Sequence, residues 1–407
     1  MSAQAAERAR DHLGYSRWWL VVAAAAMMAV VSPYQYVWTA IETPIAESLD
    51  VPLPAIGLVF TLFVVFQAGS QYPVGEWRDR HGPRAITLLA GVLAGGGYMG
   101  LAYATAVWQV YLCYSLGAIG VGIVYTVAVN TALKWFPDRR GLTTGVGTMA
   151  FAAGSAAFVP FVRAHASAGG YADALRPMGL LIGVVVVAGA LVLRDPPAEF
   201  VTGGKGEEGY ERAGETYAPR EMLKTWQFWL LYAMFVAGSG AGLMLTAKVI
   251  QFAASFDLSA DVATLSAVVL PIAGGVGRTV IGWLSDRFER RWAIFGTFLL
   301  CGIGLFIALW AGAEGASAAF VAAVFVATFF WSPQYALFPA LVVDYYGTPY
   351  SSANNALLYS GKIWGGVFGG AVAGWLVAAT SWTTTFAVGG VLAVLAGVGA
   401  VALRPPA

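Results

Sequence analysis

Residues 75–84 read GEWRDRHGPR, and residues 282–291 read GWLSDRFERR. Both stretches begin with Gly and carry an Asp-Arg pair four residues later, so the pattern Gly-x-x-x-Asp-Arg recurs at an offset of 207 residues. Each copy lies between two long apolar stretches, at equivalent places in the two halves of the chain. An internal repeat of this kind indicates two related helical bundles with a binding site between them near the membrane midplane, as in secondary transporters.

The composition excludes a water-soluble protein of ordinary proportions. The 407 residues are 58% hydrophobic and 11% charged, with a mean hydropathy of +0.69. A membrane-spanning helix needs about 20 apolar residues, and the chain contains twelve such stretches. The expected crossings are 18–40, 54–76, 84–105, 107–133, 142–163, 176–194, 226–250, 260–283, 291–311, 316–341, 350–378 and 381–403.

The largest polar interruption is 195–225, whose run GGKGEE at 203–208 is typical of a flexible linker. We therefore expect an all-α integral membrane protein of twelve transmembrane helices. It would consist of a six-helix bundle over 1–194, a cytoplasmic linker over 195–225 and a second six-helix bundle over 226–407. No soluble catalytic module and no Ser/His/Asp set at a shared depth is recognisable, so we do not expect an enzyme.

The distribution of positive charge predicts the topology. Of the 23 Lys and Arg, 18 fall in the chain ends and the even-to-odd loops, and only Arg163 and Arg176 fall on the opposite side. By the positive-inside rule both termini are cytoplasmic, and the first helix remains as an anchor. This topology also explains the basic residues without nucleic acid, and the net charge is only +1. The two Cys and three His are scattered, so no disulfide, metal or cofactor site is expected.

Two cations lie inside expected crossings with no Asp or Glu at comparable depth. Lys362 lies about 18 Å into its helix and Arg278 about 12 Å from the cytoplasmic loop, at 1.5 Å per residue. A charge near the centre of a spanning helix costs about 2.5–3.5 kcal/mol, so it normally has a partner or a task. A small anion would be such a partner. Lys248 lies near the outer end of its helix, where its ammonium can reach the interface.

Aromatic and polar residues are candidates for the rest of the lining. For each of them, packing and ligand contact remain alternatives, because an aromatic ring serves both and Tyr and Trp add a hydrogen bond. The candidates are Gln35, Tyr36, Tyr125, Trp331, Tyr335 and Tyr359, and Gln67 and Gln71 share one face of the second crossing.

The first repeat resembles the Gly-x-x-x-Asp-Arg-x-Gly-x-Arg loop of the major facilitator superfamily, and the twelve-helix plan agrees. The resemblance implies that Asp79 contacts the start of the eleventh helix and Asp286 that of the fifth, where a helix N-terminus favours negative charge. The Asp-Arg pairs Asp79-Arg80 and Asp286-Arg287 are therefore gating candidates. The second copy has Glu289 where Gly is usual, and a purely topogenic role of both loops remains the alternative.

Four short runs resemble the oxalate/formate antiporter branch more closely: YQYVWT at 34–39, QAGSQ at 67–71, GVGIVY at 120–125 and YALFP at 335–339. The resemblance implies that Arg278 and Lys362 bind oxalate and that Tyr36, Tyr125, Trp331 and Tyr335 enclose it. The sequence departs from that branch at three positions. It has Tyr359 where the branch has Trp, Lys248 where the branch has a neutral polar residue, and Gly57 where the branch has Gln.

We therefore expect an antiporter of small carboxylates, oxalate for formate, that works as a monomer in the lipid bilayer of an inner membrane. The alternative is a proton-coupled carrier of monocarboxylates, although the nearest acid, Glu42, lies near the outer end of the first helix. A receptor that binds the anion without moving it is a third reading, and it would require saturable binding without flux.

Overall fold

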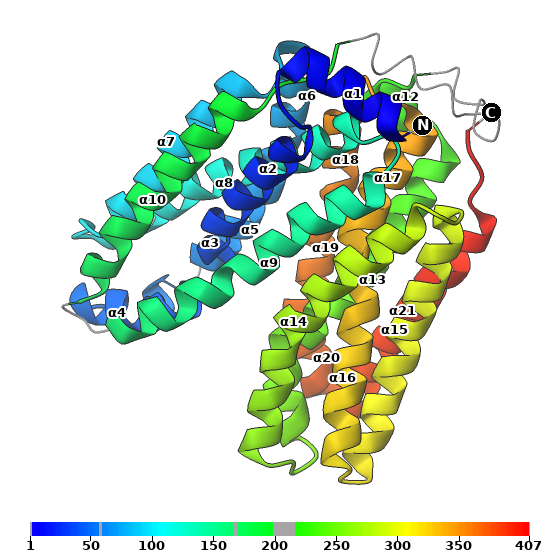
Figure 1. Cartoon of the computed structure of the whole chain (residues 1–407). Coiled ribbons are helices and arrows are strands. Elements are labelled where there is room, and N and C mark those ends of the chain that lie inside the picture. The colour runs from blue at the N-terminus through cyan, green and yellow to red at the C-terminus, as the bar shows by residue number, and fades with distance from the viewer. Residues whose placement is uncertain (1, 57–58, 166–169, 198–215, 407) are drawn as a thin grey trace. The chain divides into compact units, whose positions relative to one another are not determined.

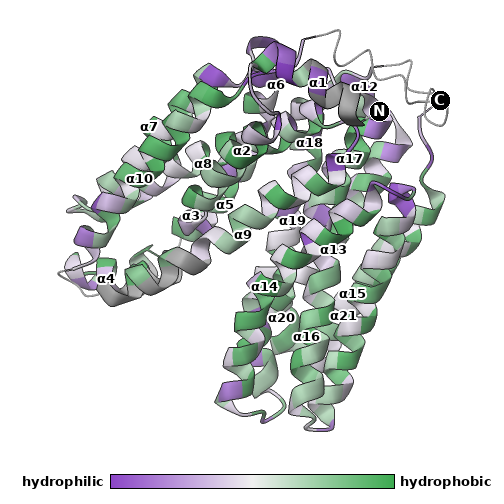
Figure 2. Ribbon diagram, viewed as in Figure 1, coloured by the Kyte–Doolittle hydropathy of each residue, from purple (hydrophilic) through white to green (hydrophobic). Residues whose placement is uncertain are grey.

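The computed structural model describes residues 2–56, 59–165, 170–197 and 216–406, and every regular element in these residues is a helix (Figure 1). Hydrophobic residues predominate along the long helices, whereas hydrophilic residues gather at the helix ends and in the connecting turns (Figure 2). This distribution fits helices that cross an apolar layer and end in water.

The first part of the chain contains α1 (Ser2–Leu13), α2 (Trp18–Val31), α3 (Pro33–Tyr36), α4 (Trp38–Ser48), the 3-10 turn η1 (Leu53–Ile56), α5 (Val59–Gly69), α6 (Gln71–His81), α7 (Arg84–Leu101), α8 (Val107–Trp135), α9 (Arg140–His165) and α10 (Tyr171–Val192). The second part contains α12 (Pro219–Met222), α13 (Trp226–Ala254), α14 (Ala260–Ser285), α15 (Arg290–Ala313), α16 (Ser317–Trp331), α17 (Gln334–Tyr346), α18 (Ser351–Tyr359), α19 (Gly361–Val367), the π-helical turn η2 (Phe368–Val372), α20 (Ala373–Ala379) and α21 (Trp382–Ala402).

Ten helical stretches of the described residues are long and apolar enough to cross a membrane. The two further expected crossings fall on other elements. The stretch 142–163 lies within α9, and 54–76 falls on η1, α5 and α6, with residues 57–58 outside the described part.

Proline explains three interruptions that the expected crossings did not show. Proline cannot donate a backbone hydrogen bond, and its ring disturbs the helical turn that precedes it. Pro33 follows the break between α2 and α3, Pro73 follows the break between α5 and α6, and Pro333 lies between α16 and α17. Two of these breaks adjoin candidate site residues, Gln35 and Tyr36 at the first and Trp331 and Tyr335 at the third.

Glycine lets α13 pack closely along the segment α19–η2–α20. A Cβ at Gly365 would overlap Ser239, and a Cβ at Gly369 would lie 2.6 Å from the Met244 backbone nitrogen. The stripe continues at Gly374, five residues on rather than four, because the π-helical turn η2 adds one residue to the turn there. A Cβ at Gly374 would lie 3.8 Å from the Lys248 ammonium. Small residues at such spacings allow close helix contact in lipid.

The chain forms two compact units. The first unit comprises Met1–Asp138, Ala150–Thr216 and Gly347–Ala356, and the second comprises Arg139–Met149, Tyr217–Tyr346 and Leu357–Ala407. In the first, α8 packs against α2, α5 and α7, and α7 against α10; in the second, α15 packs against α21 and α16. Compared with a division into 1–194 and 226–407, each unit includes one short segment, the start of α9 or of α18, from the other half of the sequence.

Candidate substrate-binding site

Arg278 on α14 and Lys362 on α19 both belong to the second unit, and both are buried, with 6% and 5% of their surface exposed. They approach the same aromatic ring. The Arg278 Cζ lies 4.8 Å and the Lys362 Nζ 6.0 Å from the centre of the Tyr335 ring. The Lys362 Nζ also lies 5.4 Å from the centre of the Tyr359 ring. Two cations that sit far apart in the sequence therefore share one aromatic neighbour.

The Arg278 guanidinium is held by neutral groups. Its Nε donates to the Ser332 Oγ over 2.6 Å, and its Nη1 donates to the Thr148 carbonyl oxygen over 2.8 Å. Gly145 brings the first turns of α9 against the Arg278 backbone, since a Cβ there would overlap the Arg278 carbonyl. The contacts orient the positive charge of Arg278 without neutralising it.

The candidate aromatic residues of this unit form a connected group. Trp331 and Tyr335 are 5.8 Å apart between ring centres, and Tyr335 and Tyr359 are 6.0 Å apart. Phe235 on α13, which the sequence analysis did not single out, packs on both Tyr335 and Tyr359. In the sequence it is one of several large apolar residues along α13, so nothing distinguished it from core residues.

Gln35, Tyr36 and Tyr125 lie in the first unit. Tyr36 on α3 and Tyr125 on α8 both pack against Phe151 of α9, with ring centres 5.9 Å and 5.7 Å apart. Gln35 and Tyr36 are partly exposed, whereas Tyr125 is buried. Phe151 was not among the residues expected from the sequence.

Each repeat aspartate contacts the start of a helix. The Asp79 Oδ2 accepts hydrogen bonds from the backbone N–H groups of Ser352 (3.0 Å) and Ala353 (3.1 Å) at the start of α18. Asp286 accepts from the N–H groups of Gly141 (2.8 Å) and Leu142 (2.9 Å) at the start of α9. A carboxylate in this position satisfies free N–H donors and interacts favourably with the positive end of the helix dipole. The Asp79 contact lies within the first unit and the Asp286 contact within the second, because each unit includes the helix start that its aspartate contacts.

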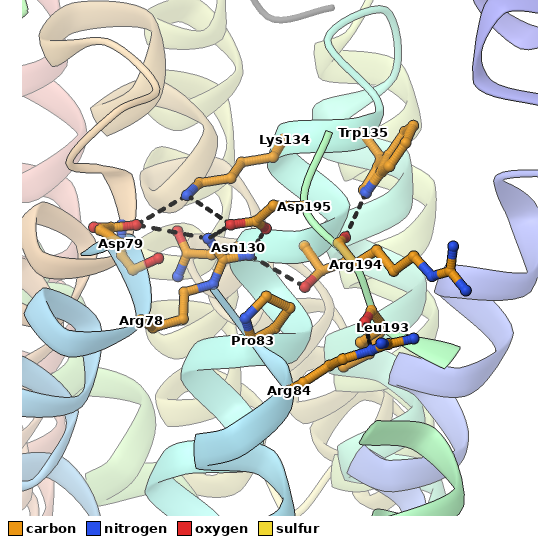
Figure 3. A network of polar contacts seen from close by, with 12 residues as sticks. Arg78, Asp79, Pro83, Arg84, Asn130, Lys134, Trp135, Leu193, Arg194 and Asp195 are labelled. Atoms are coloured by element: carbon orange, nitrogen blue, oxygen red, sulfur yellow. Dashed lines mark hydrogen bonds and ion pairs between the residues drawn. The ribbon is translucent and has the colours of Figure 1, made fainter. Parts of the chain in front are cut away.

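The arginines that follow these aspartates, Arg80 and Arg287, make other contacts. The Arg80 side chain is 67% exposed and pairs with Glu76 over 2.6 Å, and Arg287 lies 3.5 Å from the Trp283 ring centre. In the first unit the buried arginine that pairs with Asp79 is Arg78. Ion pairs of Arg78 and Lys134 link Asp79 to Asp195 (Figure 3). Lys134 Nζ lies 3.0 Å from Asp79 Oδ1, and Arg78 Nη2 lies 2.7 Å from Asp195 Oδ1.

The second unit has a related network, in which Arg290 pairs with Asp286 over 2.7 Å and with Asp344, and Arg140 pairs with Asp344 over 2.8 Å. Neither network is predicted by the sequence pattern, because its basic residues also fit the positive-inside rule and nothing singles out Asp195 or Asp344.

Lys248 lies on α13 and is partly exposed. Its ammonium lies near Gly374, the second residue of α20. In the described part of the chain, no three His, Cys, Asp or Glu side chains come together in a group that could hold a metal ion. The contacts described around Arg278 and Lys362 are with aromatic rings and, for Arg278, with neutral hydrogen-bonding groups.

These features define a polytopic membrane carrier, and the chain belongs to the Major Facilitator Superfamily, whose sequence profile matches residues 18–269 and 233–407. It is 33% identical to the oxalate:formate antiporter of Oxalobacter formigenes over 377 residues, which cover 91% of this chain and 87% of that protein. It is also 26% identical to monocarboxylate transporter 11 of Homo sapiens over 275 residues, 65% of this chain and 55% of that one.

Solved structures agree on the fold. The fucose transporter FucP in the outward conformation superposes with a TM-score of 0.73 at 13% identity, over 94% of this chain and 97% of that chain. The proton:xylose symporter XylE superposes with a TM-score of 0.75 at 14% identity, over 94% of both chains. The protein is therefore a multi-pass membrane transporter with the twelve-helix fold of this superfamily.

Proposed function

We propose that the protein exchanges small carboxylates across the membrane, with oxalate and formate as the pair. The observation that carries the proposal is the burial of Arg278 and Lys362 around the Tyr335 ring. The likeness to the oxalate:formate antiporter, at 33% identity, supports the same choice of substrate.

The charge of the site supports exchange rather than one-way transport. Two cations removed from water cost several kcal/mol each unless they are compensated. A dicarboxylate compensates both, so the loaded carrier reorients readily, whereas the empty carrier is held back by its own charge. One anion then leaves only when another replaces it. Arg278 grips a carboxylate with its planar fork, and Lys362 acts as a compact point charge.

Further residues take roles in the same proposal. The substrate also contacts Gln35, Tyr36, Tyr125, Trp331, Tyr335 and Tyr359. Asp79 and Asp286 hold the starts of α18 and α9 in one state of the transport cycle and release them in the other. Arg80 and Arg287, which are exposed or stacked on a ring, contribute to the cytoplasmic charge of their loops rather than to these contacts. The carrier works as a monomer in an inner membrane, with both termini cytoplasmic.

The test is counterflow in liposomes that contain the purified protein. Vesicles are preloaded with oxalate, formate or buffer, and uptake of labelled oxalate is followed in each. We expect rapid uptake in the first two and little in the third. No oxalate uptake in vesicles whose protein is correctly inserted would refute the proposal.

A proton-coupled monocarboxylate carrier is the second candidate, because monocarboxylate transporter 11 is among the relatives. The same vesicles distinguish the two functions. A pH-sensitive dye in the lumen reports acidification during lactate uptake into buffer-loaded vesicles, which a proton-coupled carrier would produce and an anion exchanger would not.

A further inference from the structure

Ser332 lies where the helix that carries Trp331 and Tyr335 is interrupted. It follows the last residue of α16 and precedes Pro333, and it is fully buried. Its Oγ accepts a hydrogen bond of 2.6 Å from the Arg278 Nε. Gly274, one turn before Arg278 on α14, leaves room for this contact, since a Cβ there would lie 3.1 Å from the Ser332 Oγ. The serine thus reaches Arg278 from the break in its own helix.

The hydrogen bond restricts how Arg278 can receive a carboxylate. A guanidinium has five N–H donors, and a carboxylate can bind two of them in parallel, either along the edge of Nε and Nη2 or across the terminal Nη1 and Nη2. Ser332 occupies Nε, and the Thr148 carbonyl takes one of the two N–H groups of Nη1. The edge of Nε and Nη2 is therefore closed to bidentate binding, which leaves the terminal edge or a contact to a single N–H group.

We propose that Ser332 is a positioning residue that sets the preference for a dicarboxylate over a monocarboxylate. By closing the Nε edge it presents the terminal edge of Arg278 in one orientation relative to Lys362. Oxalate carries two carboxylates joined by a single bond, so it needs both cations in fixed register, whereas formate needs one. Freeing the guanidinium to rotate therefore weakens oxalate binding more than formate binding. The inference rests on the proposed function and assigns a specificity determinant within it.

The experiment compares Ser332→Ala with the wild type in detergent, with oxalate and formate affinities measured by isothermal titration calorimetry. We expect oxalate affinity to fall at least about tenfold, the loss typical of a hydrogen bond to a charged group. Formate affinity should fall less than about threefold. Ser332→Thr, which keeps the hydroxyl, should recover most of the oxalate affinity.

Ser266→Ala is the matched control. Ser266 lies on the same helix as Arg278 and is fully buried, and its Oγ has no hydrogen-bond partner among the described residues. Its removal should leave both affinities unchanged. If Ser332→Ala does not yield folded protein, Gly274→Ala carries the test, because its methyl group would push the Ser332 Oγ away from Nε and should lower the oxalate preference in the same way.

An unchanged ratio of oxalate to formate affinity in folded Ser332→Ala, whether neither affinity falls or both fall equally, contradicts the inference alone. A wild-type protein that binds neither anion would overturn the proposed function itself and this inference with it. The wild-type titration therefore separates the two failures.

Discussion

Both buried cations, Arg278 and Lys362, lie near the ring of one residue, Tyr335. A cation near the face of an aromatic ring gains about 0.5–2 kcal/mol, more when water is excluded. Because the ring is neutral, in the proposed site it would stabilise Arg278 and Lys362 without competing for their charge when an anion binds. An acidic partner would also stabilise the two cations, but it would compete with the anion for their charge.

The ring, rather than the hydroxyl, should carry this role. Tyr335→Phe keeps the ring, so we expect oxalate exchange within about threefold of wild type, whereas Tyr335→Leu removes the cation–ring contacts and should lower it by about tenfold or more. Initial rates of counterflow in liposomes measure the difference. Equal losses in the two variants would show that the hydroxyl matters instead.

The cations themselves should be indispensable. Arg278→Gln and Lys362→Gln each remove one charge that the dianion compensates, and we expect either change to abolish oxalate counterflow while the protein still inserts and elutes as a single species. Lys248→Gln is the matched control, because it removes a partly exposed cation near Gly374 instead. Its exchange should be retained, and full activity in either of the other variants would remove the central claim.

At the scale of elements, the glycine stripe between α13 and the segment α19–η2–α20 allows a prediction with an adjacent control. A Cβ at Gly369 would lie 2.6 Å from the Met244 nitrogen, whereas the neighbouring Gly370 is exposed and has open space around it. Gly369→Ala should lower the free energy of unfolding by about 1–3 kcal/mol through overpacking.

Gly370→Ala should leave stability unchanged or raise it slightly, because both substitutions gain the same helix propensity. Thermal unfolding midpoints in one detergent compare the two. A similar midpoint for both variants would mean that the helices can separate at this point without cost.

The helices themselves were largely predictable, because their length and apolar composition are local properties of the sequence. The depths of Arg278 and Lys362 in the membrane stay predictions from residue counting at a fixed rise per residue. Their shared neighbour Tyr335 was a candidate, although nothing in the sequence assigned it to both cations.

What the sequence did not reveal depends on pairing between distant residues. Lys134 and Asp195 meet Arg78 and Asp79 only after the helices pack, and no periodic pattern precedes such a contact. The sequence also does not predict the π-helical turn η2, because its extra residue shows only as a spacing of five between Gly369 and Gly374. The contact of Ser332 with Arg278 spans 54 residues and required the break at Pro333.

For the whole molecule, the proposed exchange of a dianion for a monoanion has an electrical consequence. Each inward step of oxalate against formate moves one net negative charge inward, worth about 2.3 kcal/mol per 100 mV. An inside-positive potential, imposed with valinomycin and a potassium gradient, should therefore accelerate oxalate uptake into formate-loaded vesicles. Oxalate-for-oxalate exchange moves no net charge and serves as the control. Equal sensitivity of the two modes would contradict the stated stoichiometry.

The exchange of the starts of α9 and α18 between the two units has a consequence for how the chain can be divided. A gene cut within the linker would encode two polypeptides, and neither would contain a complete unit. The first would have Asp79 without the N–H groups of Ser352 and Ala353, and the second would have Asp286 without those of Gly141 and Leu142. Each fragment would supply the piece that the other lacks, so the two should accumulate only when they are synthesised together.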